Sequence, residues 1–130
     1  MKKILAFVTA LALCATSAMA GEFPDISIDE LETQIGKGKV TVIDVNGSKS
    51  YERGHIPGAI DFAKAGKNLK SLLPKDKDAL IVAYCGGPSC RAYQRAAKAA
   101  EKLGYTNVKH LSAGISGWLQ ASKKTEKAAN

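Results

Sequence analysis

The strongest structural signal in the chain is the stretch LIVAYCGGPSCR, residues 80–91. Its apolar first half suits a strand that is buried on both faces. The following residues 92–103 are rich in Ala, Lys, Arg and Gln, which favour a helix. Cys85 therefore lies where a strand gives way to a helix, and we interpret the segment between them as an active-site loop.

Several features of this loop would stabilise an anion. The first N–H groups of a helix lack intrahelical partners and carry the positive end of its dipole, so a Cys85 thiolate would be stabilised there. Gly86 and Gly87 permit backbone conformations that turn successive N–H groups toward the sulfur or an anionic ligand. Arg91 adds a fixed positive charge. We therefore expect Cys85 and Arg91 to be catalytic, with Gly86, Gly87 and Ser89 binding the substrate.

The N-terminus has the pattern of a secretory signal peptide. Two lysines precede an uncharged stretch at 4–13, and residues 18–20 read AMA, which predicts cleavage after Ala20. The apolar stretch is too short to span a membrane. A lipoprotein signal would have a small residue before Cys14, where this chain has Leu13. We expect a periplasmic or secreted protein that is not inserted in a membrane after cleavage.

The remaining 110 residues, 21–130, are a common size for one domain. We expect a domain over 21–121 and a flexible tail over 122–130. Without the two lysines of the signal peptide, 17 basic and 12 acidic residues leave a net charge of about +5. The lysines are scattered and are not interleaved with aromatic residues, so we expect no nucleic-acid partner. This mild excess favours small anionic substrates, and we expect a monomer.

Strand-like and helix-like segments alternate along the domain, which predicts an α/β sandwich with a largely parallel sheet. Ser27 and Glu30 resemble a capping box, and Ser48 is placed to cap a short helix. We expect Trp118 in the core. Strands are predicted at 40–45, 59–61, 80–85 and 108–111, and helices at 28–35, 48–53, 67–73, 92–103 and 115–121.

Motifs along nearly the whole domain resemble the rhodanese family. They are VIDV at 42–45, YERGHIPGAI at 51–60, the Cys85 loop, LGYTNV at 103–108 and GISGW at 114–118. The resemblance implies a rhodanese-like three-layer sandwich with a mostly parallel five-stranded central sheet. It also implies a sulfurtransferase whose cysteine takes the outer sulfur of a small anionic donor, such as thiosulfate or a polysulfide. The resulting persulfide passes that sulfur to cyanide or a thiol, and the reaction uses no metal or cofactor.

Three polar residues of these motifs are expected to be structural, His55 by the same resemblance. His55 is expected to stabilise a turn rather than to act as a general base. Asp44 and Arg53 are expected to be structural, as a charge pair near the site.

The loop departs from the usual rhodanese pattern in its length. Arg91 lies six residues after Cys85, whereas the family places it five residues after the cysteine. A Cys-x5-Arg loop resembles that of phosphatases and arsenate reductases of the same fold, where a wider cradle holds a tetrahedral oxyanion. Against this alternative, Pro88 removes one backbone donor and those phosphatases lack a cysteine at the position of Cys90.

The second departure is Cys90 itself. After export, Cys85 and Cys90 are an even pair in an oxidising compartment, which favours a disulfide. That bond could be a structural staple, or a reversible bond in which Cys90 is a resolving thiol that attacks the Cys85 persulfide. Cys90 could instead simply pack against the sheet. The pair therefore also allows a dithiol redox protein, and a non-catalytic sulfur-binding or partner-binding module is the last alternative.

Overall fold

Strand β3 (Leu80–Tyr84) is an inner strand of a parallel sheet in the computed structural model, which describes residues 23–128. The predicted signal peptide lies outside the described residues. The strand order is β2-β1-β3-β4, and all three pairings are parallel. The other strands are β1 (Val40–Asp44), β2 (Ile60–Asp61) and β4 (Val108–His110).

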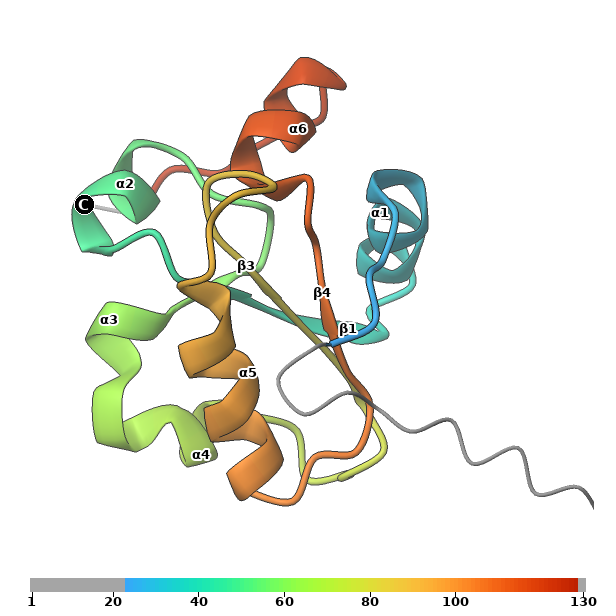
Figure 1. Ribbon diagram of the computed structural model, residues 1–130, viewed down its shortest axis with the longest axis vertical. Helices are drawn as coiled ribbons and strands as arrows, with labels where there is room; N and C mark the ends of the chain where they lie inside the picture. Colours follow the sequence, from blue (N-terminus) through green and yellow to red (C-terminus); the bar gives the residue numbers. More distant parts are fainter. Residues whose placement is uncertain (1–22, 129–130) are drawn as a thin grey trace, which may run out of the picture.

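Helices cover both faces of this sheet, as Figure 1 shows. One face is covered by α1 (Ile28–Gly36) and α6 (Gly114–Gln120). The other is covered by α3 (Phe62–Ala65), α4 (Leu69–Leu72) and α5 (Tyr93–Lys102). The connections contain α2 (Ser48–Arg53) and a 3-10 turn, η1 (Gly66–Asn68). The three-layer α/β sandwich is confirmed.

Over residues 23–128 the sheet has four strands, so the prediction of five is wrong. The segment before α1 pairs with β4 through a single bridge between Asp25 and His110. The Ile26 N–H donates to the His110 carbonyl at 2.9 Å, and the His110 N–H donates to the Pro24 carbonyl at 2.8 Å. Pro24 has no N–H, and the cap of α1 begins at Ser27, so the ladder cannot extend in either direction.

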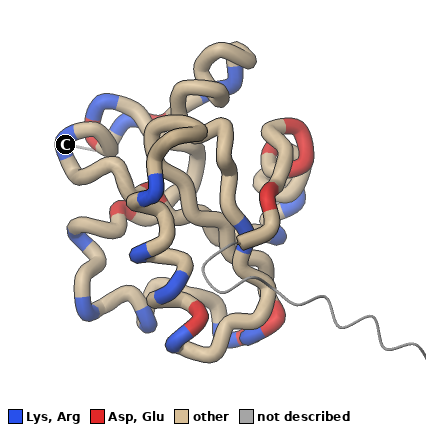
Figure 2. The backbone as a smooth tube through the Cα atoms, viewed as in Figure 1, with Lys and Arg blue, Asp and Glu red and all other residues tan. Residues whose placement is uncertain are grey.

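Charged residues are unevenly distributed over the helices, as Figure 2 shows. The exposed side of α1 carries Asp29, Glu30 and Glu32, whereas α5 carries three cations, Arg95, Lys98 and Lys102, and one acidic residue, Glu101. Over residues 23–128 no helix has the length and apolar character needed to cross a membrane.

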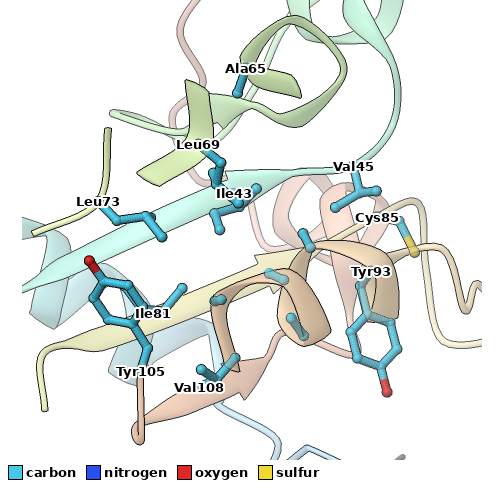
Figure 3. Close-up of a cluster of buried hydrophobic side chains, with 14 residues drawn as sticks. Ile43, Val45, Ala65, Leu69, Leu73, Ile81, Cys85, Tyr93, Tyr105 and Val108 are labelled. Atoms are coloured by element: carbon cyan, nitrogen blue, oxygen red, sulfur yellow. The ribbon is translucent and has the colours of Figure 1, made fainter. Parts of the chain in front are cut away.

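Successive side chains of β3 point to opposite faces of the sheet and join two separate apolar clusters, one on each face. Ile81 and Ala83 join the cluster under α3, α4 and α5, which also holds Cys85 (Figure 3). Val82 and Tyr84 join the cluster under α1 and α6. The prediction of a strand buried on both faces is confirmed, and each large apolar side chain buried here contributes about 1.5–3 kcal/mol.

The two capping predictions differ in outcome. At the start of α1, the Glu30 N–H donates to the Ser27 Oγ at 3.1 Å, as expected. The prediction for Ser48 is wrong, because Gly47 occupies the N-cap position of α2. The Ser48 hydroxyl donates instead to the Asp61 Oδ2 at 2.6 Å. Ser48 is thus the first residue of α2, and its hydroxyl acts as a donor in a charge-assisted bond to a carboxylate instead of accepting from a backbone N–H of the helix.

The residues after α6 pack back onto the fold. The Trp118 Nε1–H donates to the Lys124 carbonyl at 2.8 Å. His55 and Glu126 exchange two backbone hydrogen bonds of 2.9 Å, and the Gly58 N–H donates to the Glu126 carboxylate at 3.1 Å. The segment 122–128, where the sequence predicts a flexible tail, thus connects α6 with the turn at 54–58.

A buried carboxylate connects the end of β1 to the end of β3. The Tyr84 hydroxyl donates to the Asp44 Oδ2 at 2.6 Å and accepts from the Ile56 N–H at 3.1 Å. The Asn46 N–H donates to the Asp44 Oδ1 at 2.7 Å. Burial raises the pKa of Asp44, and these two donors oppose the rise. The predicted charge pair of Asp44 with Arg53 is wrong, because Arg53 is exposed and Asp44 is satisfied by neutral donors.

Replacing Tyr84 by Phe should destabilise the fold in a pH-dependent way. Because the pKa of Asp44 is raised on folding, stability falls as the pH rises through that pKa, and losing the phenol donor raises the pKa further. We expect Tyr84→Phe to lower the free energy of unfolding by about 1–3 kcal/mol at pH 7 and by less near pH 4, in urea titrations.

The matched control is Tyr105→Phe. The Tyr105 hydroxyl donates to the Pro74 carbonyl, so its removal should cost the same at both pH values. A Tyr84→Phe loss that is equally independent of pH would contradict the role assigned to Asp44.

Candidate active site

The Cys85 loop begins at the carboxyl end of β3 and leads into α5. Ligands of parallel α/β sheets bind outside this edge, beyond the carboxyl ends of the strands. The Val45 N–H donates to the Tyr84 carbonyl at 2.9 Å, so the residues after β1 lie beside the start of the loop. Val45, Cys85 and Tyr93 belong to one apolar cluster (Figure 3).

Cys85 and Cys90 are joined by a disulfide. Their Cα atoms are 6.3 Å apart, within the usual range for bonded cysteines. Cys85 is 1% exposed, whereas Cys90 is partly exposed. The loop is therefore in an oxidised state, in which neither sulfur is a nucleophile until the bond is opened.

The start of α6 packs against the backbone of the Cys85 loop. The Ile115 N–H donates to the Cys85 carbonyl, and the Ser116 N–H donates to the Gly86 carbonyl, both at 3.0 Å. Gly114 has a φ of +62°, and a Cβ at this position would lie 2.6 Å from the Gly86 carbonyl atoms and the Gly87 nitrogen. The loop backbone and α6 are thus in direct contact, with no space for a side chain.

The conformational reason expected for Gly86 and Gly87 does not apply to the disulfide-bonded loop. Neither residue has a positive φ. A Cβ would meet the Asn46 Oδ1 at 3.8 Å from Gly86 and the Ser116 Cβ at 3.9 Å from Gly87, which are ordinary contacts. The position that requires glycine is Gly114. Its GISGW motif is visible in the sequence, but the contact with the loop joins segments far apart in the chain.

Asn46 is a neighbour of the loop that the sequence interpretation treated only as part of a turn. Asp44 is in register with Tyr84, which places Asn46 across from Gly86. The Asn46 Nδ2 is buried and has no hydrogen-bond partner among the described residues. The pairing of β1 with β3 is the signal that identifies Asn46, because Asn46 and Gly86 each lie two residues beyond the paired residues Asp44 and Tyr84.

The remaining predicted loop residues lie toward solvent. Ser89 and Arg91 are exposed, and Gly86 and Gly87 are half-buried. The Gln94 N–H donates to the Arg91 carbonyl at 3.1 Å, so the turn that leads into α5 begins at Arg91. No carboxylate within residues 23–128 forms an ion pair with the Arg91 guanidinium.

His55 has the surroundings of a structural residue. It is buried, its Nδ1 lies 2.8 Å from the Tyr51 carbonyl, and its ring stacks on Tyr51 with a centroid distance of 3.6 Å. Its backbone pairs with Glu126. These contacts agree with the expected turn-stabilising role. Trp118 is 2% exposed in the α1 and α6 cluster, so the core prediction for it is confirmed.

A pocket of about 380 Å³ lies between the residues that follow β1, α3 and α5. It shares Val45 with the cluster that contains Cys85. Its walls are mostly apolar, with one guanidinium from α5. The lining residues are Val45, Gly47, Phe62, Ala63, Gly66 and Arg95.

Comparison with known proteins places this arrangement in a family. A sequence model described as "Rhodanese-like domain" matches residues 27–121. The chain belongs to the rhodanese-like domain family. Similar proteins include the thiosulfate sulfurtransferase GlpE of Pseudoalteromonas translucida, 30% identical over 109 residues that cover 81% of this chain and 98% of that protein. The family match agrees with the rhodanese α/β fold described above.

Two further relatives resemble this chain over most of its length. The HTH-type transcriptional regulator Rv0324 of Mycobacterium tuberculosis is 33% identical over 121 residues, 92% of this chain. The chain spans only about half, 52%, of that regulator. The solved structure of the BH2092 protein from Bacillus halodurans superposes with a TM-score of 0.67 at 30% identity, over 80% of this chain and 77% of that one.

The contact between Gly114 and the loop predicts a specific sensitivity. Gly114→Ala adds a methyl group 2.6 Å from the Gly86–Gly87 peptide at a positive φ, so we expect a loss of about 1–3 kcal/mol in the free energy of unfolding. We also expect faster reduction of the disulfide by dithiothreitol, because the displaced loop exposes its sulfurs.

Gly36→Ala is the control, because nothing lies within 4 Å of a Cβ there. Its effect should stay within about 0.5 kcal/mol. If the two alanine variants were equally stable and equally slowly reduced, α6 would not support the loop as described.

Proposed function

We propose that this chain is an exported sulfurtransferase that carries sulfane sulfur as a persulfide on Cys85. The observation that carries the proposal is the position of Cys85, buried at the carboxyl end of β3 at the start of a loop that ends in a cation. The proposal is also supported by the membership of this chain in the rhodanese-like family and by its similarity to a thiosulfate sulfurtransferase over 98% of that protein.

The first half-reaction starts from the reduced loop. The Cys85 thiolate attacks the outer sulfur of thiosulfate, the sulfur–sulfur bond of the donor breaks, and sulfite leaves with the electron pair. Arg91 and the loop N–H groups hold the anionic donor and then the persulfide anion. Transfer to cyanide or an external thiol returns the Cys85 thiolate.

A second route uses Cys90. Its thiolate attacks the Cys85 sulfur of the persulfide, the terminal sulfur leaves as sulfide, and Cys85 and Cys90 become a disulfide. The sulfane sulfur gains the two electrons that the two thiols lose. The presence of this bond in the structure supports the route, since it requires that the two sulfurs can meet. A dithiol reductant is then needed to reopen the loop.

The same bond favours a second candidate function. A dithiol redox protein would use the Cys85–Cys90 couple to carry electrons, with no sulfur atom gained or lost. The two candidates differ in whether a persulfide forms on the reduced protein.

The test is to incubate the reduced 21–130 protein with thiosulfate and to locate any added sulfur by intact mass and peptide mapping. We expect one sulfur atom on Cys85, removed by cyanide. Cys85→Ser should lower thiosulfate:cyanide transfer by at least about 100-fold, because the nucleophile itself is lost. Retained transfer in this variant, or turnover of a phosphate ester or arsenate without any persulfide, would refute the assignment.

Cys90→Ser tests the resolving route separately. This variant should still form the Cys85 persulfide and should accumulate it, because no second thiol can displace sulfide. Sulfide release at the rate of the unsubstituted protein would exclude Cys90 as the resolving thiol. A wild-type protein that cycles between dithiol and disulfide but never gains sulfur would instead identify the redox candidate.

Export rests on the N-terminal pattern. We expect the protein recovered from the periplasm or medium to begin at Gly21, which N-terminal sequencing would show. A chain that still begins at Met1 in the cytoplasm would contradict it.

A further inference from the structure

The two sulfurs of the disulfide differ in how they can be reached. Cys85 is 1% exposed, beneath the loop and against the α5 cluster, whereas Cys90 is partly exposed. Thiol–disulfide exchange requires a thiolate to contact the sulfur that it attacks. In this conformation the accessible target is Cys90, and the group released is the buried Cys85.

A row of cations runs from Cys90 along the outer side of α5. Arg95, Lys98 and Lys102 are spaced three and four residues apart on one face of α5, and Arg91 lies in the turn that leads into the helix. All four are exposed, and the opposite face, with Ala96, Ala97 and Ala100, is buried. Figure 2 shows blue segments along α5, with one red segment near its end.

We name these four residues the α5 cation row. Its three helical members span about 10 Å at the rise of an α-helix, and Arg91 lies between them and Cys90 in the sequence. No carboxylate within the described part of the chain forms an ion pair with these four cations. Four unpaired cations in series fit a macromolecule with an acidic surface.

We propose that Cys90 is the entry sulfur for a dithiol protein with an acidic surface, which docks on the α5 cation row and reduces the Cys85–Cys90 bond. This inference rests on the proposed function, because a persulfide cycle that ends in this disulfide requires a reductant.

The exchange balances in two steps. A thiolate of the partner attacks the Cys90 sulfur, the Cys85–Cys90 bond breaks, and Cys85 leaves as a thiolate, which gives a mixed disulfide between the partner and Cys90. The partner's second thiolate then attacks its own bonded sulfur and releases Cys90 as a thiolate. The partner is oxidised to its disulfide and supplies both electrons.

The cations contribute mainly to the rate of encounter. Complementary charge speeds the association of proteins, and the acceleration is lost as salt screens it. The same row would disfavour reductants with a basic surface. The direction of attack also leaves the more buried sulfur as the thiolate that next meets the sulfur donor.

The experiment uses the oxidised 21–130 protein and an acidic thioredoxin whose resolving cysteine is replaced by serine. After mixing, free thiols are blocked with N-ethylmaleimide and the products are mapped. We expect the probe on Cys90 and the blocking group on Cys85, at a rate that falls with added salt. The probe on Cys85 would overturn the proposal.

Two double variants test the docking surface. Arg95→Gln/Lys98→Gln should slow the reaction with the acidic probe by at least about threefold, while reduction by uncharged dithiothreitol stays unchanged. Lys37→Gln/Lys39→Gln removes two exposed cations between α1 and β1, outside α5, and should leave both rates unchanged. Equal rates for the two double variants, or no reaction of the acidic probe with a protein that dithiothreitol reduces, would overturn the docking site.

These readouts use no sulfur donor. A protein that fails to form a persulfide can still show entry at Cys90, and a protein that forms one can still show entry at Cys85. The failure of the proposed function and the failure of this inference are therefore distinguishable.

Discussion

The contact between Gly114 and the Gly86–Gly87 peptide sets the position of the loop on which any chemistry at Cys85 depends. Two N–H groups at the start of α6 donate to the Cys85 and Gly86 carbonyls. These carbonyl oxygens are therefore paired with α6, and their negative partial charge is offset there. The loop is consequently held on its α6 side by backbone atoms.

The disulfide gives this loop two chemically distinct ends. At one end Cys85 is buried in the apolar cluster shared with Val45 and Tyr93, and at the other Cys90 packs against that cluster but is partly exposed beside Arg91. A pair of cysteines with equal exposure could be opened from either side. Here the fold itself makes the bond directional, because β3 buries the first cysteine before the loop turns outward.

Much of the fold could be predicted because its signals are local. The run at 80–84 specified an inner strand, and the Ser27 hydroxyl specified the start of α1. The predicted fifth strand does not form, because Pro24 and the cap of α1 at Ser27 interrupt its pairing with β4. The position of Cys85 could be predicted because it directly follows the last residue of β3. Its disulfide was left open, since short sequence spacing alone does not fix the path of a loop.

The predictions that failed or were missing depend on contacts between distant segments. Nothing within the residues around Gly86 indicates that the required glycine is Gly114, and nothing around Asn46 shows that it borders the loop. The predicted charge pair of Asp44 with Arg53 does not form. Burial instead selected neutral donors from Tyr84 and Asn46, whose positions depend on the pairing of β1 with β3.

The packing of residues 122–128 has a practical consequence for where this domain ends. The family match stops at residue 121, yet the Trp118 indole N–H finds its acceptor at Lys124 and the His55 backbone pairs with Glu126. A protein trimmed to the matched boundaries would leave a buried indole donor unsatisfied and would open one side of the GHIPGA turn. The folded domain therefore extends beyond its recognisable motifs, and its last residues join the motif that contains Trp118 to the motif that contains His55.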